Sequence, residues 1–172
     1  AITKIPSYAI YMPIKNKAME RLFLKIRERY GTIFIKATDF KEKRQEIFKE
    51  RFAFFFSADQ NPGDPTNAYW QNYFRKPAPF ITGPEVGGIK NDTAIVFVRS
   101  TIHKRGHYIL ECTVFCESAA ATSHGEITRG FRDFLEKIIR EEPHNYLWTH
   151  RRWKWDYKEE YSKNWIDTRP VQ

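Results

Sequence analysis

The chain has 172 residues, of which 41% are hydrophobic and 16% aromatic, and its 29 Lys and Arg against 21 Asp and Glu give a net charge of +8. This composition excludes a disordered polymer or a fibre, and it suffices for one packed domain or part of one. Uncharged stretches such as residues 53–58 and 69–74 fall far short of the roughly 18 to 20 apolar residues that span a bilayer.

The first part of the chain predicts a helix, a strand and a second helix. Residues 16–30 carry apolar side chains at helical spacing, ended by Gly31, and residues 32–36 form a β-branched and aromatic run. Helical spacing returns over residues 40–52. The apolar run of residues 53–57 is typical of a central strand buried on both faces, and a polar, turn-rich loop follows it.

The second part predicts a short helix over residues 82–90, a β-hairpin over 93–104 and 107–117, and a helix from about 125 to 140. The aromatic, proline-punctuated stretch of residues 69–80 indicates no particular element. We see no internal repeat and no long linker. The predicted fold is α/β, with a mixed, partly parallel sheet flanked by helices in a single domain over residues 1–172.

The positive charge is concentrated near the N-terminus. Residues 1–52 contain 13 basic and 6 acidic side chains, whereas residues 53–143 contain 10 and 11. A basic region of this kind suits nucleic acid, an acidic membrane surface or a phosphosugar. An ordinary set of solvated helix faces would give the same count.

Known metal, phosphate and nucleophile motifs are not found. Cys112 and Cys116 lie four apart in a predicted strand, about 13 Å apart on one face, which is too far for a disulfide. His103 and His107 flank the hairpin turn and have no evident third metal ligand. The chain has no glycine-rich phosphate loop and no Gly-x-Ser-x-Gly elbow. We therefore expect no metal and no cofactor.

Two segments carry candidate functional residues. Asp59 and Gln60 directly follow a predicted strand at its carboxyl end, where ligands collect in open α/β sheets, although a plain turn would use the same residues. Residues 146–155 alternate aromatic and basic side chains. Such a segment can bind single-stranded nucleic acid, lie at a membrane–water interface, or stack its guanidinium groups on aromatic rings to fix the C-terminus.

The second segment resembles a known family. Residues 143–154, Pro-His-Asn-Tyr-Leu-Trp-Thr-His-Arg-Arg-Trp-Lys, are similar to the Pro-x-x-Tyr-x-Trp-x-His-Arg-Arg-aromatic-Lys signature of the late acyltransferases of lipid A biosynthesis, the lauroyl and myristoyl transferases. Residues 10–17 resemble the family's Tyr-Arg-Pro-Leu-x-Asn segment, an Arg-rich helix end follows at residues 27–31, and Asp59-Gln60 matches its Asp-Gln or Asp-His loop.

The resemblance implies a glycerolipid-acyltransferase-like fold and the transfer of a fatty acyl group from acyl carrier protein to a hydroxyl of a lipid A precursor. It places the enzyme at the cytoplasmic face of the bacterial inner membrane, in contact with an anionic surface. It also implies that Asp59 and Gln60 bind the acceptor and that Arg27 or Arg29 contacts a phosphate. Arg151 and Arg152 are interpreted as mainly structural, with lipid phosphate as a second possible contact. There are two alternatives: acyl transfer to another lipid acceptor, and a basic nucleic-acid-binding module. We favour both less than acyl transfer to a lipid A precursor.

The sequence departs from the family at two points. The family's catalytic pair is His-x-x-x-x-Asp/Glu, but the residues five after the histidines are Tyr108, Cys112, Arg129, Thr149 and Trp155. The chain therefore resembles the C-terminal portion of a longer enzyme, without the upstream catalytic block and membrane helix, and we expect it to be inactive alone and to self-associate. The second departure is that the family's Phe-Phe-Gly reads Tyr73-Phe74-Arg75 here.

Overall fold

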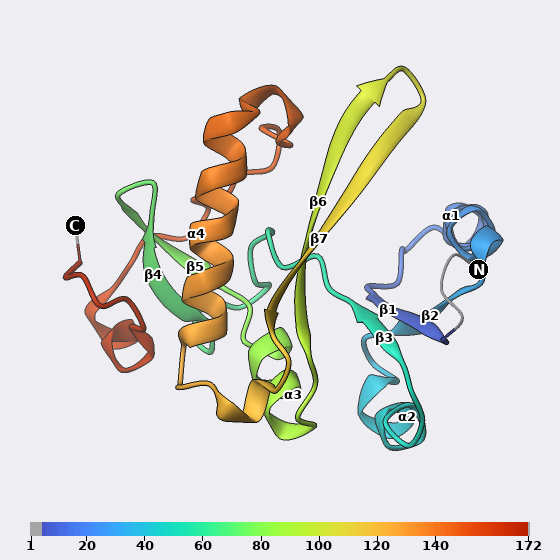
Figure 1. The fold of residues 1–172 in the computed structure, drawn as a ribbon, viewed down its shortest axis with the longest axis horizontal. Helices are drawn as coiled ribbons and strands as arrows, with labels where there is room; N and C mark the ends of the chain where they lie inside the picture. Colours follow the sequence, from blue (N-terminus) through green and yellow to red (C-terminus); the bar gives the residue numbers. More distant parts are fainter. Residues whose placement is uncertain (1–4, 172) are drawn as a thin grey trace. The chain divides into compact units, whose positions relative to one another are not determined.

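The structure is a computed structural model that describes residues 5–171, and the chain forms two compact units, Ala1–Ser57 (unit 1) and Ala58–Gln172 (unit 2) (Figure 1). The predicted α/β class with partly parallel strands is confirmed, although the strands are divided among three small sheets rather than joined in one. That the two units form a single acyltransferase domain stays a prediction. Between residues 5 and 171, every helix is too short or too polar to cross a membrane.

Unit 1 is a three-stranded parallel sheet with a helix in each crossover. Its elements are β1 (Ser7–Tyr11), α1 (Lys17–Arg27), the 3-10 helix η1 (Glu28–Tyr30), β2 (Thr32–Lys36), α2 (Phe40–Ile47) and β3 (Ala53–Phe55). The strand order is β2-β1-β3, so β1 lies at the centre. Helix α1 begins after Asn16, whose side chain accepts hydrogen bonds from two backbone N–H groups, as expected of an N-cap. The predicted helix, strand and helix are thus confirmed.

The prediction that residues 53–57 form a central strand buried on both faces is wrong. β3 lies at the edge of the sheet, and the side chains of Phe55 and Phe56 are 49% and 39% exposed. The run is apolar because Phe54 packs between aromatic rings, with its centroid 5.4 Å from that of Phe40 on α2 and 4.8 Å from that of Phe56. Aromatic packing on one side of the strand therefore explains the hydrophobic run.

Unit 2 is built on two antiparallel hairpins and a long helix. Its elements are β4 (Tyr69–Tyr73), β5 (Lys76–Phe80), α3 (Gly83–Lys90), β6 (Ile95–Lys104), β7 (His107–Cys116), η2 (Ala119–Ala121), α4 (Glu126–Glu141), η3 (Pro143–Asn145) and η4 (Glu159–Asn164). The predicted hairpin and both helices are confirmed. The β4–β5 hairpin was not predicted; it turns at Phe74 and Arg75, which both have positive φ angles, 49° and 63°. Cys112 and Cys116 are free thiols, as expected.

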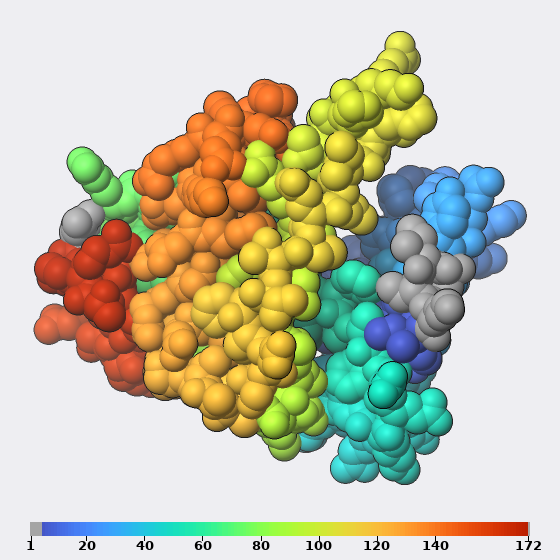
Figure 2. Space-filling view, viewed as in Figure 1, coloured from blue at the N-terminus to red at the C-terminus, as the bar shows by residue number. Residues whose placement is uncertain are grey.

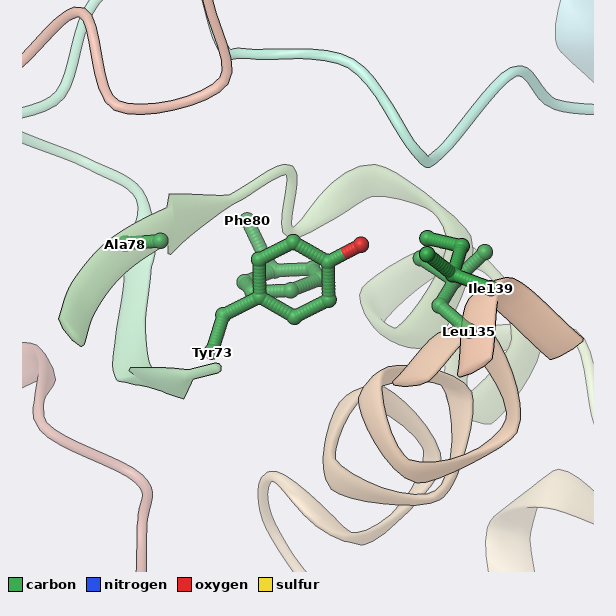
Figure 3. Close-up of a cluster of buried hydrophobic side chains, with 5 residues drawn as sticks. All are labelled: Tyr73, Ala78, Phe80, Leu135 and Ile139. Atoms are coloured by element: carbon green, nitrogen blue, oxygen red, sulfur yellow. The ribbon is translucent and has the colours of Figure 1, made fainter. Parts of the chain in front are cut away.

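The core of unit 2 forms where α4 covers the β4–β5 hairpin. Tyr73, Ala78 and Phe80 from the hairpin meet Leu135 and Ile139 from α4, and all five are buried (Figure 3). Helix α4 presents these two residues four positions apart on one face, which follows from its period of 3.6 residues. The hairpin is thereby fixed against the helix, and the chain on either side of it is held in place.

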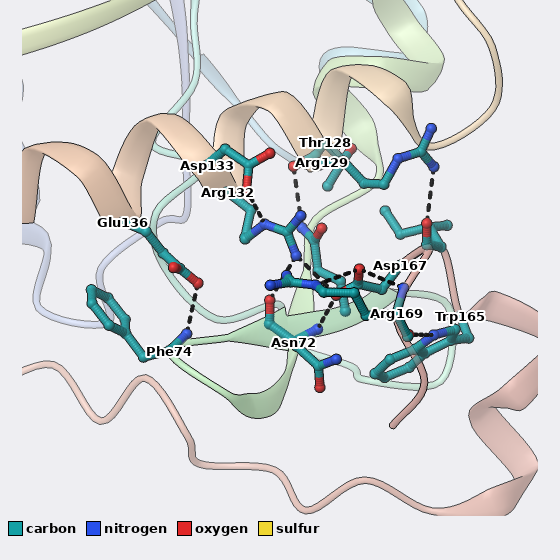
Figure 4. A network of polar contacts seen from close by, with 12 residues as sticks. Asn72, Phe74, Thr128, Arg129, Arg132, Asp133, Glu136, Trp165, Asp167 and Arg169 are labelled. Atoms are coloured by element: carbon teal, nitrogen blue, oxygen red, sulfur yellow. Dashed lines mark hydrogen bonds and ion pairs between the residues drawn. The ribbon is translucent and has the colours of Figure 1, made fainter. Parts of the chain in front are cut away.

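A polar network closes the C-terminal end of the chain onto the same elements. The Asp167 carboxylate accepts hydrogen bonds from Arg132 Nη1 on α4 and from the backbone N–H of Asn72 on β4, both at 2.9 Å (Figure 4). Arg169 donates to the same carboxylate from Nε and Nη2, each at 3.1 Å. Burial alone would raise the pKa of Asp167. The hydrogen bonds from Arg169 and Asn72 outweigh this effect and lower the pKa to about 2. Asp167 is therefore a carboxylate at neutral pH.

Candidate functional site

The loop that carries Asp59 and Gln60 is held by a segment some 90 residues further along the chain. Asn61 joins the two: its Nδ2 donates to the backbone carbonyl of Arg151, and its Oδ1 accepts from Arg152 Nη1 at 2.8 Å. The backbone N–H of Asn61 points at His150 Nε2, 3.5 Å away. The acidic loop and the aromatic, basic segment, which the sequence presents as two separate motifs, therefore form one site.

Two further hydrogen bonds fix the loop beyond Asn61. Trp155 Nε1 donates to the carbonyl of Pro62 at 3.2 Å, and Asp64 Oδ1 accepts from the backbone N–H of Thr66 at 2.9 Å. The second bond lowers the pKa of Asp64, as expected for a turn carboxylate that caps a backbone amide. The loop is thus positioned on both sides of Asn61.

Arg152 lies in the core beneath this loop. Its side chain is only 2% exposed, and its guanidinium carbon lies 4.3 Å from the ring centroid of Phe80 and 5.2 Å from that of Tyr73. Nε and Nη2 have no hydrogen-bond partner among the described residues. Burial lowers the pKa of Arg152, and the neighbouring Tyr73, Tyr146 and Asp59 partly offset this. Stacking on two aromatic faces thus replaces part of the lost hydration.

The structure places the rest of the segment in the same packing. Trp153 stacks on Tyr73 with a centroid distance of 5.6 Å, whereas the side chain of Arg151 is exposed. Of the three interpretations of the aromatic, basic segment, the structural one fits Arg152 and Trp153, because Arg152 is buried and the partly buried Trp153 ring stacks on Tyr73. Arg151 keeps its charge at the surface, where an anionic group can reach it.

Asp59 and Gln60 occupy the outer side of the site. Asp59 is half-buried and Gln60 is exposed, and within residues 5–171 neither side chain makes a hydrogen bond or ion pair. Asp59 lies close enough to Tyr146 to affect it: burial raises the pKa of Tyr146, and the Asp59 charge adds to the rise. A carboxylate and an amide with free hydrogen-bonding capacity can together bind a hydroxyl or an amide of a ligand.

His150 is part of the site, although its role was not predicted. Its Nε2 faces the Asn61 N–H and accepts a long hydrogen bond from it. Nδ1 is buried and has no partner in the described part of the chain. The spacing of His150 from Asn61 gave no sequence signal, because the contact joins residues that are far apart in the chain.

Arg27 and Arg29 lie in unit 1, and their surroundings differ. The Arg27 guanidinium stacks on Phe23 of α1 at 5.7 Å and on Phe34 of β2 at 5.8 Å. Arg29 stacks only on its neighbour Tyr30 and lines a groove of about 440 Å³ together with Leu22, Lys25 and Ile26. Arg27 is thus tied into unit 1, whereas Arg29 lies in an open groove with a second cation.

One comparison with known proteins identifies the family to which the chain belongs. The family model of bacterial lipid A biosynthesis acyltransferases matches residues 3–155, which include β1 to β3, the Asp59 loop and the segment that holds it. No curated protein matches the chain significantly. Residues 5–171 contain no group of three or more His, Cys, Asp or Glu side chains that could hold a metal ion. Because the match covers most of the chain, the protein belongs to the family of bacterial lipid A biosynthesis acyltransferases.

Proposed function

We propose that the chain binds the acceptor of a fatty acyl transfer, a phosphorylated and acylated glucosamine disaccharide, through the loop of Asp59 and Gln60. The acyl donor is acyl carrier protein, and the protein works as a peripheral protein at the cytoplasmic face of the inner membrane. The observation that carries the proposal is the Asn61 junction, which presents two unpaired polar side chains over a buried, fixed support. Family membership supports acyl transfer on lipid A.

Arg29 is the better candidate of the two arginines for a phosphate contact. Its groove adds Lys25 and two aliphatic side chains, which suits a partner that carries both an anionic group and an acyl chain. Arg27 already packs on two aromatic rings. The proposal therefore assigns Arg29 to an anionic partner, the acceptor or the acidic carrier protein, and Arg27 to the stability of unit 1.

The acceptor assignment is tested by binding of a lipid A precursor in detergent, measured by isothermal titration calorimetry. Asp59→Asn and Gln60→Ala should each weaken binding about tenfold, since each removes hydrogen bonds to a polar ligand worth about 1.4 kcal/mol. Asp64→Asn is the matched control, because Asp64 lies in the same loop but caps Thr66. Equal affinities of the Asp59→Asn and Asp64→Asn proteins would contradict the assignment.

The donor and the general base are tested separately. Arg29→Glu should weaken binding of acyl carrier protein or of the acceptor, whereas Arg21→Glu on the neighbouring helix α1 should not. None of the five histidines is followed five residues later by an acid, so the family's base pair is not found in residues 1–172. We therefore expect no acyl transfer by this chain alone. Rapid turnover with acyl carrier protein and the precursor would refute this expectation.

The alternative of a nucleic-acid-binding module is less well supported. Single-strand binding needs exposed aromatic rings beside exposed cations. Arg152 is buried, Trp153 packs on Tyr73, and Trp155 donates to Pro62, so three of the candidate groups are occupied, whereas Trp148 and Arg151 are exposed. Absence of salt-sensitive binding to single-stranded DNA at low ionic strength would remove this alternative.

A further inference from the structure

The β6–β7 ribbon of unit 2 has one face without any charged residue. Residues that lie opposite each other in an antiparallel pair point to the same side of the ribbon. The register of β6 and β7 therefore gathers eight residues on one side, which we call the apolar ribbon face: Val96 with Val114, Val98 with Cys112, Ser100 with Leu110, and Ile102 with Tyr108. From Val96 to Ile102 this face extends about 20 Å along the strand.

The apolar ribbon face is exposed to solvent, whereas the β6 side chains of the opposite face pack against or pair with α4 and the residue that follows it. The exposed fractions of its six large side chains are 44% for Val96, 43% for Val98, 48% for Ile102, 64% for Tyr108, 63% for Leu110 and 60% for Val114. On the opposite face Phe97 is buried, with its ring 5.4 Å from Phe131 and 5.3 Å from Phe134 of α4. Arg99 on the same side pairs with Glu141 and Glu142. These contacts fix the β6 side of the opposite face against α4, so the apolar ribbon face points away from the helix.

The tip of the ribbon is cationic. Lys104 ends β6 and Arg105 forms the turn with Gly106; His103 and His107 flank these residues, and all four side chains are exposed. No acidic residue occurs between Ser100 and Leu110, and neither Lys104 nor Arg105 makes an ion pair within residues 5–171. In Figure 2 this tip projects beyond the remainder of unit 2. An uncharged face that ends in unpaired cations is complementary to a surface with an apolar interior and anionic headgroups.

The segment after α4, which is tied to the same ribbon, carries an exposed tryptophan. Asn145 donates from Nδ2 to the carbonyl of Ser100 on β6, which ties the segment after α4 to the edge of the ribbon. Leu147 and Trp148 follow in that segment with exposed fractions of 60% and 58%. The indole Nε1 of Trp148 donates to the Pro143 carbonyl, so its polar atom is already bonded. Tryptophan is enriched at the membrane–water interface, where an apolar ring can lie among the headgroups.

We propose that the apolar ribbon face docks unit 2 on an anionic lipid bilayer. The face lies in the boundary between headgroups and acyl chains, and Lys104 and Arg105 contact lipid phosphates. The inference rests on the proposed function, since an enzyme that acylates a lipid must meet it at a membrane. It goes further by naming the surface that makes the contact. A β-ribbon with a satisfied inter-strand ladder can lie in this boundary while its outer backbone edges remain among polar headgroups.

Cys112 allows a direct test, because it lies on the apolar ribbon face and is exposed. The full chain with Cys116→Ser is labelled at Cys112 with an environment-sensitive fluorophore. Vesicles of phosphatidylglycerol and phosphatidylethanolamine should shift its emission to the blue and should sediment with the unlabelled protein. Vesicles of phosphatidylcholine should bind at least about tenfold more weakly, since each Lys or Arg near an anionic surface contributes about 1 kcal/mol. An unchanged emission with the anionic vesicles would overturn the proposal.

Variants distinguish binding through this face from nonspecific adsorption of the protein to vesicles. Leu110→Glu and Val114→Glu should each lower the affinity for anionic vesicles at least about tenfold, because a carboxylate must then leave water. Val86→Glu on α3 is the matched control, since Val86 is also about half exposed but lies elsewhere. Circular dichroism establishes that each variant is folded. Equal affinities of the Val114→Glu and Val86→Glu proteins would overturn the proposal.

Two outcomes distinguish this inference from others. If the emission of labelled Cys112 shifts with protein concentration without vesicles, and sedimentation equilibrium gives a dimer that Leu110→Glu dissociates, a second copy covers the face and the proposal is wrong. Binding of the acceptor in detergent does not require the ribbon. If Leu110→Glu and Val114→Glu lose vesicle binding but retain acceptor binding, the role of the ribbon is confirmed. If the unsubstituted protein binds vesicles but does not bind the acceptor, the proposed function is refuted and the role of the ribbon is not.

Discussion

The β4–β5 turn offers a test of backbone strain. Two adjacent residues there have positive φ angles, yet replacing them by glycine should change the stability of the protein in opposite directions. Phe74 and Arg75 have φ angles of 49° and 63°, which L-amino acids adopt at a cost of roughly 1 to 2 kcal/mol each. The family that the chain resembles has glycine where Arg75 stands. Arg75→Gly removes this strain, and the extra freedom of glycine in the unfolded chain costs about 0.5 to 1 kcal/mol in return. We expect a net stabilisation of about 0.5 to 1 kcal/mol.

Phe74→Gly gains the same backbone relief but loses packing. The Phe74 ring lies 4.8 Å from Tyr73 and 5.0 Å from the Arg140 guanidinium, and the side chain is half-buried. Complete removal of a buried Phe side chain costs about 3 to 5 kcal/mol, so a half-buried ring should cost roughly 2. The net effect is a destabilisation of about 1 to 1.5 kcal/mol. The hydrogen bond from the Phe74 N–H to Glu136 is retained in both variants.

Urea unfolding followed by tryptophan fluorescence measures both effects in the right part of the molecule. All five tryptophans lie in unit 2, so their emission reports on the unit that contains the turn. Arg75→Gly should raise the urea midpoint and, in a separate thermal unfolding experiment, the melting temperature by roughly 1 to 4 °C. If Arg75→Gly is destabilising, the positive φ at this position does not strain the chain. If Phe74→Gly is stabilising, the ring contributes less to packing than its contacts indicate.

Three further predictions concern unit 2. A Cβ atom on Gly130 would lie 2.3 Å from Phe115 Cε2, so Gly130→Ala should destabilise unit 2 by about 1 to 3 kcal/mol in the same urea assay, although glycine to alanine usually stabilises a helix. Because hydrogen bonds lower the pKa of Asp167 to about 2, its carboxylate should add roughly 2 kcal/mol of stability above the unfolded-state pKa of about 3.9. This contribution should be lost as the pH falls from 4 towards 2, and in Asp167→Asn the stability should change less over that range. Arg152→Met should change the free energy of unfolding by less than about 2 kcal/mol, because removing a desolvated charge offsets the lost hydrogen bond to Asn61. The same substitution should weaken acceptor binding. A loss of about 4 kcal/mol of stability would contradict this balance.

Periodicity and strand composition were sufficient to predict part of the fold, but not β1 or the β4–β5 hairpin. Helices α1 and α4 and the β6–β7 hairpin follow from helical spacing, strand composition and a glycine turn. The β4–β5 hairpin escaped because its turn residues are Phe74 and Arg75 rather than Asn and Gly, and because Pro77 and Pro79 interrupt β5. The position of β3 could not be deduced, since a run of phenylalanines looks the same whether it is buried on two faces or stacked on one.

The candidate site depended on a contact that no local pattern contains. Asp59 and Gln60 could be proposed from their place after a strand and from the resemblance. Their support could not, because Asn61 meets His150 and Arg152 across some 90 residues. Free hydrogen-bonding capacity at Asp59 and a buried, stacked guanidinium at Arg152 are properties of packing. From residue type alone, Arg152 could equally have been assigned to ligand binding and Asp59 to a structural role.

This arrangement explains why the densest motif of the chain need not contain the groups that meet the substrate. Between Pro143 and Lys154, Arg152 is occupied with packing on Phe80 and Tyr73, and the backbone of Arg151 supports the loop by accepting from Asn61, while the Arg151 side chain stays exposed. A loop that must present a carboxylate in a fixed position needs buried partners with exact geometry, and those partners tolerate few alternatives. A dense signature is thus compatible with a supporting role, and the more exposed pair Asp59 and Gln60 remains the part of the site available to a ligand.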